Sequence, residues 1–192
     1  QAVFETWLNI LQAIPDSHLL LKNSAFLSQE VKKKCLSYFT EQGIDSSRLD
    51  FRSLIEVQHK HLELYNEIDI ALDPFPYGGH ITTYEALRMG VPVITLKGSH
   101  QFGRVAMSFI DLVGLPELIT HSQETYIQCA IHIAQDHSTL KRWRKEIAER
   151  LQNSPICNGS VYMQHLENHY RSIWKEWCVT RSGHRLQKGM QE

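Results

Sequence analysis

The sequence predicts an α/β fold, and three observations support this prediction. Short apolar runs typical of buried strands alternate with segments whose apolar residues recur at helical spacing. A glycine-bearing loop joins one apolar run to a helical segment within residues 73–89. From Ser122 onward the pattern is almost entirely helical. We therefore expect a Rossmann-like half, with a mostly parallel sheet and helices on both faces, followed by a helical C-terminal third.

The expected elements follow one another in regular order. Residues 3–14 have apolar side chains at helical spacing and end at Pro15. Residues 28–42 form the next helix, with Ser28 as the N-cap and Gly43 as the stop. By the same periodicity, helices are expected at residues 59–66, 83–89, 102–113, 124–135, 138–152 and 160–178. Strands are expected at the short apolar runs 18–22, 48–52, 68–72 and 91–96.

Size and composition limit the class of protein. A chain of 192 residues suggests one domain, which we place at residues 1–179, followed by a polar tail at 180–192. The net charge of −1 argues against nucleic acid as a partner, and no apolar run is long enough to span a membrane. The cysteines are too scattered for a metal site, so we expect reduced thiols, a cytoplasmic protein and no bound metal. These are Cys35, Cys129, Cys157 and Cys178.

The glycine-bearing loop is the candidate binding site for a diphosphate. Gly79, His80, Thr82 and Thr83 stand where a strand ends and a helix begins. A helix N-terminus carries unpaired N–H groups and a partial positive charge, and glycine allows close approach to the backbone. His80 and the two threonine hydroxyls are then the side chains expected to donate hydrogen bonds to phosphate oxygens.

Glu85 has two possible roles. The run Thr82-Thr-Tyr-Glu85 fits the capping-box pattern, in which Thr82 caps the helix and Glu85 reaches back to it. Local physics slightly favours this structural role. If Glu85 instead faces the crevice at the strand ends, its carboxylate could accept hydrogen bonds from ribose hydroxyls.

Four further residues have weaker claims to the site. His61 and Tyr65 are four residues apart, so they share a helix face that could pack against a nucleobase or form part of a buried face. Lys22 ends the first strand and could reach the crevice or extend into solvent. Arg104 follows Gly103 near a helix start and could pair with phosphate or lie free on the surface.

Several motifs together resemble the C-terminal catalytic lobe of family 41 glycosyltransferases, the protein O-GlcNAc transferase and SPINDLY-like group. The most specific segment is Asp73-Pro-Phe-Pro-Tyr-Gly-Gly followed by Thr82-Thr83 and Glu85-Ala-Leu. It is preceded by His61-x-x-x-Tyr65-x-x-x-Asp69 and followed by Met89-Gly-Val-Pro-Val. The resemblance also includes Trp7-Leu-Asn-Ile-Leu, Leu21-Lys22 and Ser154-Pro-Ile-Cys-Asn158-Gly159, and it covers about residues 3–178.

The resemblance implies a GT-B fold, of which this chain is the C-terminal lobe that holds a sugar nucleotide. By residue-for-residue transfer, His80 and Thr82 contact the diphosphate, His61 lies by the base and Glu85 lies near the ribose. It also implies transfer without a metal or other cofactor, because backbone N–H groups and cations stabilise the leaving diphosphate. The family's N-terminal lobe and TPR repeats, which bind acceptor proteins, are not among these residues, and the catalytic base is expected there.

The chain departs from the O-GlcNAc transferase branch at Ile81, where that branch has a threonine. The Asp73–Tyr77 and Ser154–Gly159 segments are more SPINDLY-like. The implied donor is therefore UDP-GlcNAc or, as the next choice, GDP-fucose, transferred to Ser or Thr of proteins. The fragment alone is expected to be inactive. A non-catalytic nucleotide-binding or interaction module, or a GT-B enzyme with a different acceptor, remain the alternatives.

Overall fold

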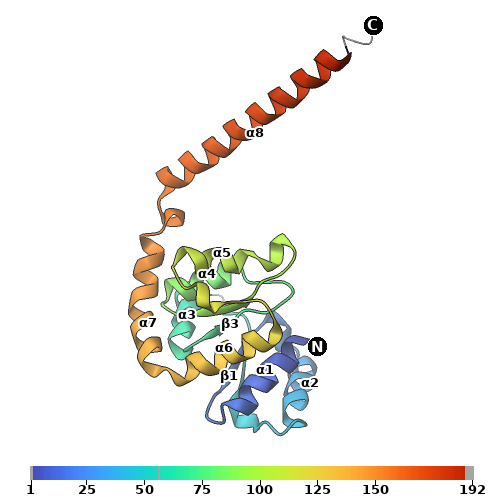
Figure 1. Ribbon diagram of the computed structural model, residues 1–192. Helices are drawn as coiled ribbons and strands as arrows, with labels where there is room; N and C mark the ends of the chain where they lie inside the picture. The colour runs from blue at the N-terminus through green and yellow to red at the C-terminus, as the bar shows by residue number, and fades with distance from the viewer. Residues whose placement is uncertain (1, 56, 189–192) are drawn as a thin grey trace. The chain divides into compact units, whose positions relative to one another are not determined.

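The computed structural model of the protein describes residues 2–55 and 57–188. The chain forms two compact units, residues 1–152 and residues 153–192. The helices of the first unit are α1 (Ala2–Ala13), α2 (Gln29–Thr40), α3 (Gln58–Glu63), α4 (Ile81–Arg88), α5 (Val105–Leu112), α6 (Gln123–Gln135) and α7 (His137–Gln152). Its strands are β1 (Leu19–Lys22), β2 (Leu49–Arg52), β3 (Ala71–Leu72), β4 (Val93–Leu96) and β5 (Ile119–Thr120). The predicted α/β architecture is confirmed (Figure 1).

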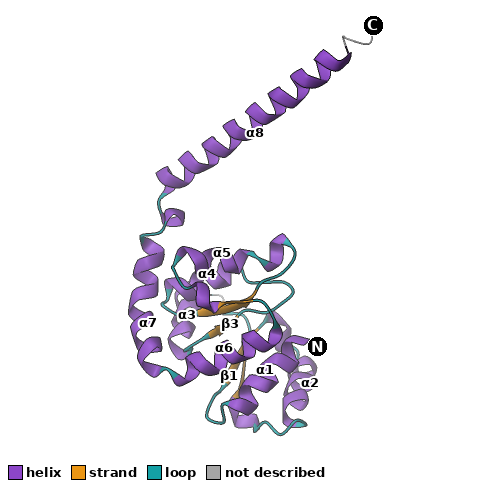
Figure 2. Cartoon of the chain, viewed as in Figure 1, coloured by secondary structure: helices purple, strands orange, loops and turns teal. Residues whose placement is uncertain are grey.

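All strand pairs of the described residues are parallel. β1 pairs with β2, with Leu19 opposite Leu49, and forms a two-stranded sheet. The second sheet has the order β3-β4-β5. Figure 2 shows these short strands surrounded by helices. Since parallel neighbours run in the same direction, their carboxyl ends lie at one edge, where α/β proteins bind their ligands.

Local sequence signals explain the first helices. The hydroxyl of Ser28 accepts a hydrogen bond from the Val31 amide, so Ser28 is the N-cap of α2 as predicted. Gly43 has φ +86° just after that helix, a conformation that glycine adopts at little cost. The guanidinium of Arg48 donates to the carbonyls of Leu11, Ile14 and Ser17 at and beyond the end of α1. A cation there satisfies free carbonyls and complements the helix dipole.

The core of the first unit lies on both faces of strand β4. Val93, Ile94 and Thr95 are at most 2% exposed. In Figure 1, α4 and α5 lie above strand β3 and α6 lies below it. Leu87 of α4 and Ile110 of α5 are fully buried in this core. Burying these apolar side chains stabilises the layered arrangement, which in turn fixes the positions of the strand ends.

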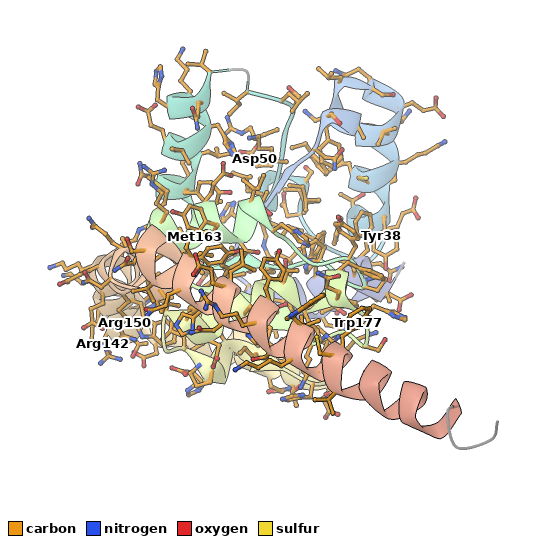
Figure 3. All side chains as sticks on the ribbon, turned by 90° about the horizontal axis from the view of Figure 1, so that it is seen from above. Tyr38, Asp50, Arg142, Arg150, Met163 and Trp177 are labelled. Carbon is orange, nitrogen blue, oxygen red and sulfur yellow. The ribbon has the colours of Figure 1, made fainter. Side chains whose placement is uncertain are left out.

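The second unit contains one long helix, α8 (Gly159–Lys188). Met163 and Trp177 are among its large side chains (Figure 3). The helix runs past the 160–178 predicted, so residues 180–188 of the predicted polar tail are helical, and residues 189–192 lie outside the described part of the chain. Among the described residues, no helix has the length and apolar character needed to cross a membrane.

Other differences concern element boundaries. Only Ala71–Leu72 of the predicted strand 68–72 pairs in the sheet, and the helix predicted at 59–66 continues beyond Glu63 as a 3-10 turn. The strand Ile119–Thr120 was not predicted, because two residues are too few to show a periodic pattern. Helix α4 begins at Ile81 rather than at 83, which changes the chemistry of its N-terminus.

Candidate nucleotide-binding site

A cavity of about 1120 Å³ runs along strands β1 and β3 and includes residues at their carboxyl ends. Its lining includes Lys22 at the end of β1, Leu54 from the loop after β2, Asp73 directly after β3, and the start of α4. The loop after β4 is not part of this lining. It instead supports the glycine-bearing loop, because the Gly78 N–H donates to the Phe102 carbonyl at 3.1 Å.

Three polar side chains from separate elements form a continuous chain of hydrogen bonds, which begins with Lys22 and His61 in the cavity lining and ends at Glu85 behind it. Lys22 Nζ donates to His61 Nδ1. The other ring nitrogen of His61, Nε2, lies 2.8 Å from Glu85 Oε2. Since the ammonium can only donate, Nδ1 is the acceptor and Nε2 carries the proton given to Glu85. The Lys22 ammonium, the His61 ring and the Glu85 carboxylate are thereby joined in one chain of hydrogen bonds.

Tyr65 completes this group from the turn after α3. Its hydroxyl lies 3.4 Å from Glu85 Oε2 and 3.3 Å from the Thr82 carbonyl. Burial, with a further contribution from the neighbouring Glu85, raises the pKa of the Tyr65 phenol well above its ordinary value, so the hydroxyl stays a donor. Burial lowers the pKa of Lys22, and the charge of Glu85 opposes this shift. The hydrogen bonds join α3, β1 and α4 around the cavity.

The glycine-bearing loop rests on a buried carboxylate. Asp73 Oδ1 accepts the Gly79 N–H at 2.6 Å, and Oδ2 accepts the Thr95 hydroxyl at 2.6 Å. Asp73 is 4% exposed, and burial raises the pKa of its carboxyl to about 6, opposed by the Thr95 and Gly79 hydrogen bonds and by His80. The Gly79 N–H is therefore engaged inside the protein.

Helix α4 presents its first turn beside this loop. His80 is the N-cap, and no side chain caps the helix. The predicted capping box is therefore wrong, because the helix starts one residue before Thr82 and Glu85 points to His61 and Tyr65 instead. The N–H groups of the first turn have no carbonyl one turn earlier in the helix, so they can bind an anion.

The exposed His80 ring stands at one end of a series of stacked aromatic rings. Its imidazole stacks on Tyr77 at 6.0 Å between centroids and an interplanar angle of 7°. Tyr77 stacks in turn on Phe102 at 5.6 Å, and Phe102 on His100 at 5.3 Å. The stack ties the loop after β3 to the loop after β4, and it holds the His80 ring at the mouth of the helix N-terminus.

The structure brings together most of the predicted site residues. Lys22, His61, Tyr65 and Glu85 form one hydrogen-bonded group, and Thr82 and Thr83 line the same cavity. Gly79 and His80 adjoin them on the loop. Gly79, His80 and Glu85 are not in the cavity lining themselves, and neither is Arg104, which is exposed at the N-cap of α5.

Asp73 was not singled out as a site residue from the sequence. An acidic residue directly after an apolar strand and before a glycine pair is a signal that could have identified it. Its partner Thr95 had no such signal, because their contact spans 22 residues. Among the described residues, no group of three or more His, Cys, Asp and Glu side chains is placed to hold a metal ion.

The fold and this cavity define a Rossmann-like lobe of the kind found in GT-B glycosyltransferases. The sequence model of glycosyl transferase family 41 matches residues 1–166, and the chain belongs to this family. It is 39% identical over 176 residues to a probable UDP-N-acetylglucosamine–peptide N-acetylglucosaminyltransferase SPINDLY from Hordeum vulgare, and 36% identical to that from Arabidopsis thaliana. Each match covers 92% of this chain and 19% of the relative.

A solved structure gives the same result. A mutant O-GlcNAc transferase from Thermobaculum terrenum superimposes with a TM-score of 0.85 at 33% sequence identity. The match covers 94% of this chain and 34% of that one. The chain thus spans about a fifth of the length of the plant relatives and about a third of the bacterial protein.

Proposed function

We propose that this chain is the donor-binding half of a protein O-glycosyltransferase. The observation that carries the proposal is the Lys22–His61–Glu85 group, whose first two members line the cavity together with Thr82 and Thr83 from the first turn of α4. A sugar nucleotide needs an anion site for its diphosphate, a flat partner for its base and an acceptor for its ribose hydroxyls. The cavity, the hydrogen-bonded group at its wall and the adjoining first turn of α4 offer a candidate for each of the three.

Each part of the donor has a proposed partner. The diphosphate binds the first-turn N–H groups of α4, with the His80 ring and the Thr82 and Thr83 hydroxyls as further donors. The base lies by His61, and the ribose lies by Glu85. Gly79 contributes close approach of its backbone rather than its N–H, which Asp73 already holds. Arg104 does not line the cavity, so the proposal gives it no contact with the phosphates.

The proposed reaction is attack of a Ser or Thr hydroxyl on the anomeric carbon of the donor sugar, with inversion. Positive groups around the diphosphate stabilise the charge that develops on the leaving group, so we propose that no metal or other cofactor is required. The catalytic base and the acceptor-binding surface would come from the N-terminal lobe and TPR repeats of the whole protein. We propose a cytoplasmic protein that uses neither nucleic acid nor membrane as a partner.

GlcNAc is the favoured sugar and fucose the next choice. The relatives from barley and Arabidopsis carry UDP-N-acetylglucosamine in their names, as does a Caenorhabditis elegans relative that is 26% identical. The Asp73-Pro-Phe-Pro-Tyr77 segment, which is SPINDLY-like, is the reason to keep GDP-fucose as the second donor.

The proposal is tested by titrating the 192-residue chain with UDP and with GDP, using ligand-observed NMR at millimolar nucleotide. We expect binding of one nucleotide that is weakened in His80→Ala. His165→Ala is the matched control, because His165 is an exposed histidine on α8 and should leave binding unchanged. Preference for UDP supports GlcNAc as the sugar, and preference for GDP supports fucose.

Binding that His80→Ala leaves unchanged contradicts the proposed site. In that case a degenerate interaction module, the alternative class of function, becomes the better explanation. Detectable sugar transfer by the chain alone contradicts the assignment of the base to the N-terminal lobe.

A further inference from the structure

The carboxylate of Asp73 lies directly beneath the glycine-bearing loop. One oxygen accepts the Gly79 N–H and the other accepts the Thr95 hydroxyl, both at 2.6 Å. Such short, charge-assisted hydrogen bonds are about twice as strong as neutral ones. The carboxylate thus ties the loop after β3 to the centre of strand β4.

The position of this carboxylate is set by the core. The Tyr126 hydroxyl of α6 donates to the Asp73 carbonyl at 3.1 Å, and Tyr126 is fully buried. The Thr120 hydroxyl of β5 donates to the Thr95 carbonyl at 2.8 Å. Asp73 and its partner Thr95 are therefore both held by neighbouring elements. The loop is thereby attached to buried parts of the molecule.

The loop is also shaped to sit on this carboxylate. A Cβ on Gly79 would lie 2.9 Å from Asp73 Oδ1 and 2.5 Å from the Thr83 hydroxyl oxygen, which leaves no room for a side chain. A Cβ on Gly78 would lie 3.0 Å from Asp73 Oδ2. The two glycines are needed for close approach to the carboxylate beneath them as well as to a ligand above.

We propose that Asp73 is a positioning residue, which fixes the Gly78–Thr83 loop and the first turn of α4 in the conformation that binds the nucleotide diphosphate without touching the nucleotide itself. This inference rests on the proposed function. An anion under an anion-binding loop is unfavourable for the ligand by charge alone. Its benefit is the rigid placement of the N–H groups that bind the diphosphate.

Protonation separates this role from a purely structural one. The titratable side chains that act on Asp73 are His80 on the loop and Tyr126 on α6. Burial raises the pKa of Asp73 to about 6, so its carboxylate is ionised at pH 7.5 and protonated at pH 5. A neutral carboxyl is a weaker acceptor for the Gly79 N–H, so the loop is held less firmly at low pH.

The experiment follows the Gly79 amide by ¹H–¹⁵N NMR between pH 4.5 and 8, in the wild-type chain and in Asp73→Asn. We expect the amide resonance to move in one step near pH 6 in the wild type and to show no such step in the variant. UDP and GDP titrations at pH 7.5 should show about fivefold weaker binding for Asp73→Asn. Asp111→Asn on α5 is the control for loss of one exposed aspartate.

Thr95→Val is a second variant, in case Asp73→Asn does not fold. It removes one hydrogen bond to the carboxylate and should shift the Gly79 step to higher pH, because that bond favours the ionised form. A Gly79 amide that does not respond to Asp73 overturns the inference, as does Asp73→Asn binding nucleotide like the wild type. If the wild type binds neither nucleotide, the proposed function fails, while the Gly79 step still decides whether Asp73 fixes the loop.

Discussion

Glu85 orients two side chains of the cavity wall, because its carboxylate accepts hydrogen bonds from both His61 and Tyr65. We predict that Glu85→Gln weakens nucleotide binding about tenfold, since the neutral amide is a poorer acceptor for ribose hydroxyls and no longer orients His61. The dissociation constant from NMR titration measures this. Glu63→Gln, at an exposed position on α3, should bind as the wild type does. Equal affinities for both variants would show that the carboxylate has no part in binding.

Gly79 has no space for a side chain, and this predicts a cost in stability. In Gly79→Ala the added methyl group would meet the Thr82 and Thr83 hydroxyl oxygens at 2.7 and 2.5 Å, so the loop must shift. We expect the free energy of unfolding in urea to fall by about 1–3 kcal/mol. Gly159→Ala is the control, because its added Cβ meets no atom within 4 Å. A Gly79→Ala protein as stable as the control would contradict the close packing of the loop.

Helices α4 and α7 pack together through the backbone at Gly90. This residue follows α4 with φ +77°, and a Cβ there would lie 2.3 Å from the Arg144 carbonyl oxygen. The Arg144 side chain adds a hydrogen bond to the Tyr65 carbonyl at 2.8 Å, which connects α7 to the turn beneath the cavity. The contact between α4 and α7 therefore helps to hold the turn that carries Tyr65.

The pair Gly90 and Gly43 separates steric overlap from backbone strain. Both have positive φ, but a Cβ on Gly43 meets nothing within 4 Å. We predict that Gly43→Ala costs about 1–2 kcal/mol from the left-handed conformation alone. Gly90→Ala should cost at least about 1 kcal/mol more, because α7 must also move away. Thermal and urea unfolding measure the stability of both variants. Equal losses of stability would mean that α7 moves away from Gly90 at little cost in free energy.

The order of the elements could be predicted from the sequence, whereas the contacts between them could not. Apolar periodicity identified α1, α2, α6 and α7, because long amphipathic segments carry a strong signal. The start of α4 was misplaced because Thr82 and Glu85 match a local capping pattern. Their actual partners lie up to 24 residues away, where Glu85 meets His61. Local rules contain no information about such contacts, so tertiary structure decided the role of Glu85.

The stability of the whole molecule should depend on the ionisation of Asp73. The pKa of this carboxyl is about 6 in the folded protein, against an ordinary value of 3.8. Between about pH 4 and pH 6 the folded state keeps the proton that the unfolded chain loses, so the free energy of unfolding falls as pH rises. We expect the difference in the free energy of unfolding between wild type and Asp73→Asn to change by about 3 kcal/mol between about pH 4 and pH 6. Above about pH 6 this difference should be constant.

Urea unfolding at a series of pH values from 4 to 7.5 measures this difference. Asp111→Asn should follow the wild-type curve in parallel, because the carboxylate of Asp111 is exposed to solvent. A wild-type curve parallel to that of Asp73→Asn would show that the buried carboxyl titrates as it does in the unfolded chain. Low pH is thus expected to favour the folded state through Asp73 while loosening the loop above it.

The hydrogen bonds from Lys22 through His61 to Glu85 also bear on the order of events during folding. The two links join residues 39 and 24 positions apart, and they connect the end of β1 to the helix that precedes β4. Contacts between such distant residues form late, because closing long loops costs chain entropy before any contact stabilises them. A folding chain that had formed only the second sheet would already have the N-terminus of α4. It would still lack the wall of the cavity that β1 and Lys22 provide, so the binding site is complete only when both sheets have formed.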